Sequence, residues 1–395
     1  MFILDEPYVS SLLLETVLKN GYEILENDFM KAEAATYNCN GFCGKFNFVS
    51  KKEALDVIEN GKIYTNSENS INFIMENCPN SNFAKVISLC KDKFQFREAL
   101  KPLYPDFFFE EISVEELDKI KFGNVGKPFI IKPAVGFLSL GVHKVRSKEE
   151  WERVKTEIRA EISEISKLFP KSVLNISKFI IEEIIEGEEF AIDVYYNSAN
   201  EPVILNILKH PFLDGDDVSD RAYVTSAAIV KENITVFSGV LSNIGKAFVQ
   251  NSLNVKNFPM HIELIKRKDG KIIPVEINPA RFAGWCTTDL AYFAYGVNVY
   301  EYFENGKKPD WELISDKAGD KIFYFAIAER PKELQTGNFK FDYEALYQNF
   351  SNILEKREIN YTEKPVYAIL FGSTNNTGEL NKILKLDMKS FVKGV

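Results

Sequence analysis

Alternating apolar and polar segments divide the first 88 residues into short strands and helices. The pattern predicts strands at residues 2–6, 22–27 and 62–66 and amphipathic helices at 10–21 and 51–61, each helix ending at a glycine. Strands that alternate with helices are typical of a parallel sheet. No G-x-G-x-x-G motif follows the first strand, so a dinucleotide site has little support there.

Farther along the chain, the pattern predicts a larger unit that is rich in strands. The expected elements are helices at 91–100, 147–158 and 236–253, strands at 127–135 and on both sides of Gly187 within 178–197, and a hairpin of strands 259–267 and 271–278. After about residue 307, strands at 321–329 and 365–372 mix with helices. A chain of 395 residues is too long for one hydrophobic core, so two or three domains are expected.

The composition is that of an ordinary globular protein, with 45% hydrophobic and 27% charged residues. The 48 basic and 57 acidic residues give a net charge of −9, which argues against a nucleic-acid partner. Binding of an anion such as ATP would therefore need Lys, Arg and backbone N–H groups gathered in one place.

The features that report on the compartment indicate the cytoplasm. No apolar run reaches the roughly 18–20 residues of a membrane helix, and the start carries Asp5, Glu6 and Glu15 where a signal peptide is basic. The five cysteines are odd in number and scattered, so a disulfide framework is not expected. Cys39 and Cys43 could form half of a metal site, but without a second pair nearby free thiols are the favoured interpretation.

The predicted hairpin carries the most informative polar side chains. Residues two apart on a strand project to the same face, so Glu276 and Asn278 point together, and Glu263 on the partner strand can join them. Two carboxylates and an amide oxygen are ligands that Mg²⁺ prefers. Arg281 follows directly, and its planar guanidinium suits a phosphate or carboxylate beside the metal. The alternative is a set of solvated polar residues on an exposed sheet face.

A glycine-rich segment follows the strand predicted at 127–135. Lys132 lies near the end of this apolar strand, where its ammonium could reach a phosphate. Gly136, Ser139 and Gly141 form a loop whose backbone N–H groups could approach phosphate oxygens. The loop is not a Walker motif, because the required Lys and Ser/Thr are missing after Gly141. A glycine-rich hairpin without a ligand is the alternative.

The segment from Ile180 to Glu189 combines apolar and acidic side chains between two predicted strands. Its isoleucines offer apolar surface for a flat ring, and Glu182 and Glu189 could accept hydrogen bonds from amino or hydroxyl groups. An acidic hinge between strands is the alternative interpretation.

In their order along the chain, the glycine-rich segment, the segment from Ile180 to Glu189 and the hairpin resemble the motifs of the ATP-grasp superfamily. The resemblance covers roughly residues 89–300. In that family a lysine on the strand before the glycine-rich loop binds ATP phosphates, which corresponds to Lys132. A second phosphate-binding lysine comes from a helix start and corresponds to Lys93, with Lys91 as the alternative. The loop at 134–141 would act as a lid that keeps water away from the reacting groups.

The same resemblance implies where the base, the ribose and the metal bind. The family's inter-domain motif E-x-x-[IL]-x-G-x-E is present as EEIIEGEE, residues 182–189. The implied adenine contacts are Glu182, Glu183 and Ile185, and Glu189 would bind the ribose hydroxyls. The implied metal ligands are Glu263, Glu276 and Asn278. Arg281 would contact the transferred phosphate or the acyl phosphate. The metal set coincides with the one derived from strand periodicity.

The implied fold class is α/β and α+β. A parallel N-terminal α/β domain (1–88) precedes a two-lobed ATP-grasp core (89–306) and a C-terminal α+β extension (307–395), and the core divides into a nucleotide-binding lobe (about 89–190) and a metal-binding lobe (about 191–306). The C-terminal extension could cover the active site, form the surface of a homodimer, or complete the core.

The implied activity is ADP-forming ligation of a small carboxylate, above all an amino acid, to an amine. Lys132 and Arg281 would be the catalytic residues, and the cofactors would be ATP and Mg²⁺, with Mn²⁺ as an alternative metal. Two other interpretations stay open: a nucleotide-binding regulator that ligates nothing, and a carboxylase or phosphotransferase on the same fold. Neither a nucleic acid nor a membrane is expected as a partner.

Two segments depart from the family pattern. Phe137 and Leu138 occupy loop positions where small or acidic residues are common, so the phosphate contacts would rest on Ser139 and the backbone. The stretch that holds His210 and Arg221 does not align with the family. These two side chains are expected substrate contacts, with a solvated acidic loop as the alternative for the aspartates between them.

Overall fold

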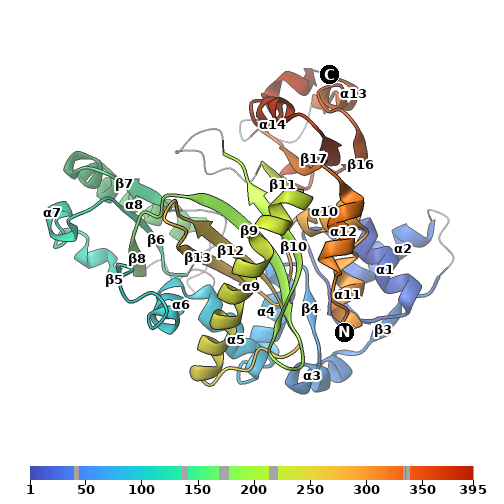
Figure 1. Ribbon diagram of the computed structural model, residues 1–395, viewed down its shortest axis with the longest axis horizontal. Coiled ribbons are helices and arrows are strands. Elements are labelled where there is room, and N and C mark those ends of the chain that lie inside the picture. The colour runs from blue at the N-terminus through green and yellow to red at the C-terminus, as the bar shows by residue number, and fades with distance from the viewer. Residues whose placement is uncertain are drawn as a thin grey trace.

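The computed structural model describes residues 1–39, 44–135, 141–168, 178–212, 221–331, 334 and 339–394. These residues form a parallel N-terminal sheet, a small four-stranded lobe and a large eight-stranded sheet (Figure 1). The mixed α/β and α+β class expected from the sequence is confirmed. No helix within the described ranges is long and apolar enough to cross a bilayer.

The N-terminal sheet is parallel, in the order β3-β2-β1-β4, as the alternation of strands and helices predicts. Its elements are β1 (Phe2–Ile3), α1 (Ser11–Asn20), β2 (Glu23–Leu25), α2 (Asp28–Cys39), β3 (Asn47–Val49), α3 (Lys51–Asn60), β4 (Tyr64–Thr65), α4 (Glu68–Asn77) and α5 (Asn82–Lys91). Helix α1 begins after Ser10, whose hydroxyl accepts from the Leu13 amide at 3.1 Å, and ends at Gly21 in the left-handed conformation (φ 64°). The hydrophobic pattern did not predict β3, α2, α4 or α5, because short apolar stretches are ambiguous between strand and helix.

The small lobe is an antiparallel sheet in the order β5-β8-β6-β7 that stands apart from the rest (Figure 1). Its elements are β5 (Phe109–Ser113), a 3-10 turn (Val114–Glu116), α7 (Phe122–Val125), β6 (Phe129–Pro133), β7 (His143–Val145), α8 (Lys148–Leu168) and β8 (Lys178–Glu183). Helix α6 (Lys93–Leu100) precedes the lobe and packs Phe96 and Leu100 into the core of the large sheet. Trp151 on α8 fills the core of the small lobe, with its ring 5.3 Å from that of Phe129 and its indole N–H donating to the Ile120 carbonyl. Ser147 caps the start of α8, since the Glu150 amide donates to its hydroxyl at 3.2 Å.

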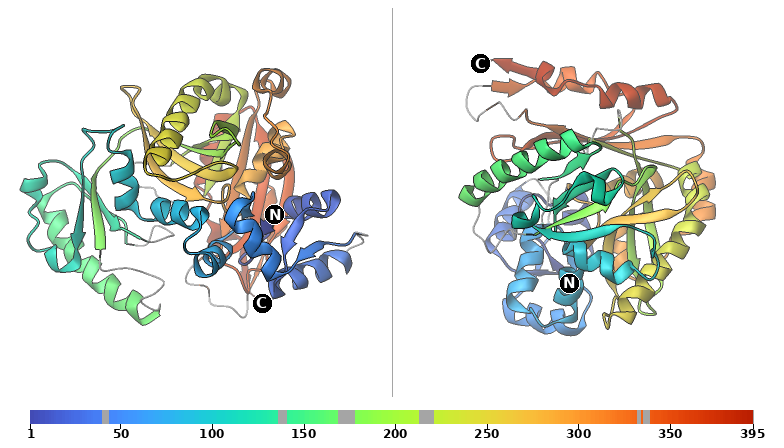
Figure 2. Two further views of the ribbon diagram at one scale, coloured as in Figure 1. Left: turned by 90° about the horizontal axis from the view of Figure 1, so that it is seen from below. Right: turned by 90° about the vertical axis from the view of Figure 1, so that its left-hand side faces the viewer.

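The large sheet has the order β13-β12-β9-β10-β11-β14-β17-β16. Its strands are β9 (Glu188–Tyr196), β10 (Pro202–His210), β11 (Ala222–Ser226), β12 (Phe258–Lys266), β13 (Ile272–Pro279), β14 (Ile322–Glu329), β16 (Ile353–Glu358) and β17 (Val366–Thr374). Along β9, Ile192 and Val194 pack against helix α9 (Ala227–Gln250), whereas Tyr195 faces the N-terminal unit. Helix α9 therefore packs on one face of the sheet together with residues of α4 and α5, whereas α1 packs on the other face (Figure 2).

The C-terminal part of the chain continues the large sheet. Strands β14, β17 and β16 follow β11 in the hydrogen-bonded order, so the segment predicted as an extension shares a sheet with the predicted metal-binding lobe. The other elements are a 3-10 turn (Thr287–Asp289), α10 (Leu290–Tyr295), α11 (Val299–Glu304), α12 (Trp311–Ala318), β15 (Phe339–Phe341), α13 (Tyr343–Tyr347), α14 (Thr377–Leu384), a 3-10 turn (Met388–Phe391) and β18 (Val392–Gly394).

Candidate functional site

Lys132 and Glu182 form a buried ion pair on neighbouring strands of the small lobe. Strands β6 and β8 run antiparallel, and Lys132 Nζ lies 2.8 Å from Glu182 Oε2. Only 8% and 3% of the two side chains is exposed. The sequence predicts that Lys132 binds phosphate and Glu182 binds adenine, and the structure places the two in contact with each other. Their roles toward ATP stay predictions.

A buried arginine on α6 completes this pair. Arg97 donates from Nε to Glu182 Oε1 at 2.5 Å and from Nη1 to the Pro274 carbonyl at 2.5 Å, and its guanidinium lies 4.4 Å from the Phe107 ring centre. Burial raises the pKa of Glu182, but Arg97 and Lys132 outweigh burial and lower this pKa to about 2. Glu182 is therefore held as a carboxylate. Because Pro274 belongs to β13, Arg97 also links the small lobe to the large sheet.

Sequence reasoning missed Arg97. The signal that could have found it is its spacing from Lys93, since residues four apart lie on the same face of a helix. That signal is weak, because two basic residues at this spacing usually mark a solvated helix face.

Lys93, the first residue of α6, lies where groups from both lobes meet. Burial lowers the pKa of its ammonium, and Glu276 is the largest opposing influence. Lys132, Glu182 and Glu263 also act on the charge of Lys93. The structure thus brings Lys93 near both the other predicted phosphate-binding lysine and the two predicted metal-binding carboxylates.

The predicted metal ligands share one face of the β12–β13 hairpin. Glu263 is directly opposite Glu276, and His261 is opposite Asn278, with a bulge after Glu263. The two carboxylates and the amide are partly exposed, so a ligand can reach them. Among the described residues no group of three or more His, Cys, Asp or Glu side chains gathers at metal-binding distance. The predicted donor set is two carboxylates and an amide oxygen, a combination that suits Mg²⁺ with phosphate and water as its other ligands.

Arg281 folds back onto this set from the turn that follows β13. Its Nη2 donates to Asn278 Oδ1 at 2.8 Å and its Nη1 to the Phe282 carbonyl at 3.0 Å. The turn is tight, with Ala280 in the left-handed region (φ 63°) and its carbonyl accepting from the Thr65 amide and hydroxyl at 2.8 and 2.9 Å. The N-terminal unit thereby fixes the turn that presents Arg281.

His261 connects the hairpin face to the same turn. Its Nδ1 lies 2.9 Å from Asp193 Oδ1, which also accepts from the Ala283 amide at 2.8 Å. Its Nε2 lies 3.9 Å from Glu263 Oε1. Asp193 is fully buried and joins His261 to the turn after β13.

The segment between β8 and β9 crosses from the small lobe to the large sheet (Figure 1). Ile185 is partly exposed in this hinge, and the Glu183 carboxylate pairs with Lys127. A Cβ at Gly187 would lie 2.4 Å from the Lys266 carbonyl, so the glycine allows the hinge to approach β12 closely. The close approach of the hinge to β12 therefore explains why a glycine occupies this position of the inter-domain motif.

The predicted ribose contact lies beside one of the predicted substrate contacts. Glu189 on β9 is opposite His210 on β10, and His210 Nδ1 lies 3.0 Å from Glu189 Oε1. The buried His210 ring stacks on Tyr223 at 4.4 Å. Arg221 instead donates to the Leu386 carbonyl at 3.1 Å, in the C-terminal part. A substrate role for His210 and Arg221 stays a prediction.

Two of the predicted loop residues, Gly136 and Ser139, lie outside the described residues. The loop's flanks are described: Gly141 adopts the left-handed conformation (φ 71°), and the Ala134 carbonyl accepts from the Lys93 amide at 2.9 Å. The start of the loop is thereby tied to the helix that carries the second predicted phosphate lysine.

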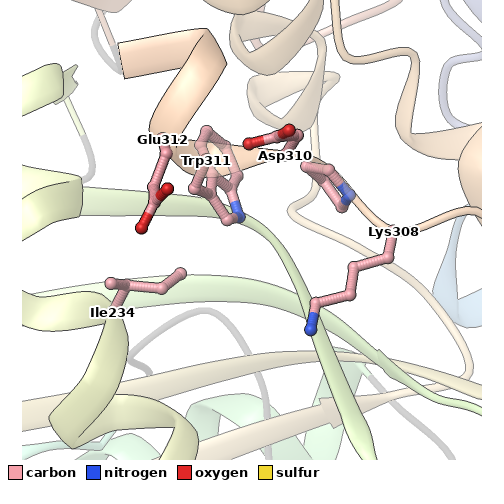
Figure 3. A pocket seen from close by; sticks show the side chains of 6 residues that line it. Ile234, Lys308, Asp310, Trp311 and Glu312 are labelled. Atoms are coloured by element: carbon pink, nitrogen blue, oxygen red, sulfur yellow. The ribbon is translucent and has the colours of Figure 1, made fainter. Parts of the chain in front are cut away.

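A separate hollow of about 480 Å³ lies between the start of α12 and helix α9 (Figure 3). Its lining residues are Ile234, Lys308, Pro309, Asp310, Trp311 and Glu312. Asp310 caps α12, and the Trp311 indole donates to the Ile204 carbonyl at 3.1 Å. These polar groups serve the fold, and none of the predicted site residues lines the hollow.

Residues 125–289 match the family model of the ATP-grasp domain. The matched range contains Lys132, the hinge and the β12–β13 hairpin with Arg281. The chain therefore contains an ATP-grasp domain. No curated protein matches the sequence.

Solved structures share this architecture at low sequence identity. The L-amino acid ligase from Bacillus licheniformis is 16% identical, with a TM-score of 0.60 and coverage of 100% of this chain and 98% of that chain. The phosphoribosylamine–glycine ligase from Thermotoga maritima is 16% identical, with a TM-score of 0.61 and coverage of 100% and 97%. The biotin carboxylase domain of 2-oxoglutarate carboxylase from Hydrogenobacter thermophilus, solved with MgADP, ADP and bicarbonate, is 14% identical, with a TM-score of 0.61 and coverage of 95% and 86%. The whole chain therefore has the ATP-grasp fold.

Proposed function

We propose that this protein is an ATP- and Mg²⁺-dependent ligase that activates a small carboxylate, above all an amino acid, and couples it to an amine. The observation that carries the proposal is the surroundings of Lys93. Lys132 and Glu182 from the small lobe and Glu263 and Glu276 from the hairpin all act on its ammonium. Cations that can neutralise phosphate charge thus lie beside carboxylates that can hold a divalent cation.

The proposed ligands of Mg²⁺ are Glu263, Glu276 and Asn278. When bound, the metal neutralises part of the negative charge on the phosphates. Lys93 and Lys132 would bind the phosphates, and Lys132 would exchange its partner Glu182 for a phosphate oxygen. On the nucleoside side, the hinge residues would contact adenine and Glu189 the ribose hydroxyls.

In the proposed reaction, a carboxylate oxygen of the acid attacks the γ-phosphorus of ATP. The bond from that phosphorus to the β,γ-bridging oxygen breaks, and ADP leaves with the electron pair. The amine nitrogen then attacks the acyl carbon, the bond from this carbon to the phosphate oxygen breaks, and the nitrogen loses a proton as the amide forms. Arg281, oriented by Asn278, would stabilise the negative charge on the transferred group.

The similar structures support this proposal and one alternative. Two of them are ligases by name, one for L-amino acids and one for phosphoribosylamine and glycine. The third is a carboxylase domain solved with bicarbonate. A carboxylation that uses bicarbonate is therefore the second candidate, and it shares the nucleotide site but not the acid substrate.

Phosphate release from Mg·ATP tests the proposal. Pooled amino acids and small carboxylic acids should stimulate release, and Glu276→Ala should lower the stimulated rate by about 100-fold or more, since a metal contributes several kcal/mol of charge stabilisation. Glu201→Ala, at the exposed turn between β9 and β10, is the matched control and should keep the wild-type rate.

Three results would overturn parts of the proposal. Near-wild-type release by Glu276→Ala would remove this carboxylate from the site. Stimulation by bicarbonate alone would favour the carboxylase. The absence of stimulated release by any pool would refute the ligase.

A further inference from the structure

A second buried guanidinium lies where the N-terminal unit, the turn after β13 and the C-terminal strands meet. Arg357 on β16 is 6% exposed in its side chain, and its Nη1 lies 2.7 Å from Asp289 Oδ2. The other oxygen of Asp289 accepts from the Tyr300 hydroxyl at 2.7 Å. Glu355 Oε1 lies 3.4 Å from Nε, and the Phe371 ring centre lies 4.9 Å from the guanidinium. The Nε and Nη1 side of the guanidinium is therefore well satisfied.

The opposite side of the guanidinium, at Nη2, is not satisfied in the same way. Arg357 Nη2 is buried and has no hydrogen-bond partner of normal geometry among the described residues. The side chains next to it are the Tyr8 hydroxyl and the Cys286 thiol. Burial raises the pKa of both groups and the guanidinium lowers it only in part, so both stay neutral near pH 7. Buried charged donors are rarely left without an acceptor, and an unfilled one indicates a missing ligand.

The turn beside Arg357 is strained. Trp285 and Cys286 are consecutive non-glycine residues in the left-handed region, with φ 48° and 56°. Such strain concentrates at ligand sites, where the surrounding structure holds it in place. The Trp285 ring stacks on Tyr8 at 6.1 Å. A Cβ at Gly284 would lie 3.4 Å from Arg281 Nη1, so the same turn has Arg281 at its start and Arg357 beside its end.

The N-terminal unit holds Tyr8 in place. The Asn66 side chain donates to the carbonyls of Asp5 and Tyr8 at 2.7 and 3.0 Å and accepts from the Asp5 amide at 2.9 Å. The loop at the end of β1 is thereby fixed before any ligand binds. Because the backbone of Tyr8 is held in this way, less entropy is lost when its side chain binds a ligand.

We propose that Arg357 Nη2, with the Tyr8 hydroxyl beside it, binds a carboxylate that does not react: the carboxylate of an amino acid that serves as the amine substrate. This inference rests on the proposed ligase function. The reacting carboxylate has to lie with the phosphates near Arg281 and Glu276, whereas Arg357 lies at the other end of the 281–286 turn. A molecule that carries both an amine and a carboxylate can place its carboxylate at Arg357 and direct its amine toward the acyl phosphate.

Conservative variants separate this role from a structural one. Arg357→Lys keeps the positive charge beside Asp289 but removes Nη2, and Tyr8→Phe removes only the hydroxyl. Each should raise the KM for amino-acid substrates, by about tenfold or more for Arg357→Lys, because a hydrogen bond to a charged group is lost. The KM for ATP should stay within about twofold. Tyr300→Phe, which removes a hydroxyl from the other side of Asp289, is the control and should leave the amino-acid KM unchanged.

The probes are a pool of the common amino acids and a pool of the same amino acids as carboxamides. The amino-acid pool is offered to wild type and variants with Mg·ATP for phosphate release, and both pools are offered with a non-hydrolysable ATP analogue for calorimetric binding. The amino-acid pool should stimulate release and bind, and the carboxamide pool, which has no carboxylate to activate and serves for binding only, should bind at least about tenfold more weakly.

The outcomes separate the two proposals. Amino-acid binding to wild type that Arg357→Lys loses, without release from any pool, would leave the carboxylate site standing and remove the ligase. Carboxamides that bind as well as amino acids, or an Arg357→Lys variant with wild-type amino-acid KM, would overturn the carboxylate site while the ligase stands. Neither binding nor release in wild type would overturn both.

Discussion

Replacing Glu182 with glutamine tests how buried charge holds the small lobe to its neighbours. Glu182→Gln keeps the shape of the side chain but removes the negative charge between Arg97 and Lys132. Two buried cations then lose their shared counter-ion, and breaking such a pair is strongly destabilising. The free energy of unfolding should therefore fall.

The pKa of Glu182 gives the expected magnitude. A value of about 2, against the ordinary 4.5, is a difference of about 2.5 and corresponds to about 3 kcal/mol. Because the pKa is depressed in the folded state, this stabilisation is complete above pH 4.5 and is lost as the pH falls toward 2. Wild type and Glu182→Gln should differ by about 3 kcal/mol near pH 7 and by about 1 kcal/mol near pH 3.

Urea unfolding followed by circular dichroism at the two pH values measures this difference. Glu183→Gln is the matched control: its carboxylate pairs with Lys127 at the edge of the lobe, where the two side chains are 16% and 40% exposed. Such a pair is worth less than about 1 kcal/mol. An equal loss at both pH values, or an equal loss from Glu183→Gln, would refute the assignment of a buried ionised carboxylate at Glu182.

Two further substitutions test the nucleotide site and the hinge. Lys132→Ala should weaken Mg·ATP binding by about tenfold or more, whereas the control Lys178→Ala, on the exposed side of β8, should keep the affinity within about twofold of wild type. A calorimetric titration measures both affinities. Unchanged affinity in Lys132→Ala would exclude this lysine from the site. Gly187→Ala should lower the free energy of unfolding by at least about 1 kcal/mol, because the new methyl would lie 2.4 Å from the Lys266 carbonyl. Gly239→Ala on α9, where a Cβ meets nothing within 4 Å, should instead stabilise slightly in the same urea titration; equal losses would contradict the close approach of the hinge.

The shared face of the hairpin residues could be predicted because the signals that place them are local. Glu276 and Asn278 are two residues apart on one strand, and a tight turn sets which residues of the partner strand face them. The observed pairing of Glu263 with Glu276 follows from a short stretch of chain. The hinge was found for a similar reason, since Gly187 and the acidic residues around it are contiguous.

The buried arginines could not be predicted in this way. Arg97 contacts Glu182 and Pro274, which are 85 and 177 residues away, and Arg357 contacts Asp289 at a separation of 68. In the sequence both arginines look like solvated surface charges. Their burial depends on how three parts of the chain pack together.

By itself, the sequence determined the strands around Lys132, Gly187 and the hairpin, the parallel N-terminal sheet and the type of the central domain. It also determined which side chains share the hairpin face. Only the tertiary structure decided that Lys132 pairs with Glu182, that Lys93 faces the carboxylates of both lobes, and that the C-terminal strands continue the large sheet. The physical reason is the sequence separation over which the interactions act. Backbone hydrogen bonding and hydrophobic periodicity act between near neighbours, whereas the partner of a buried charge is set by the packing of distant segments.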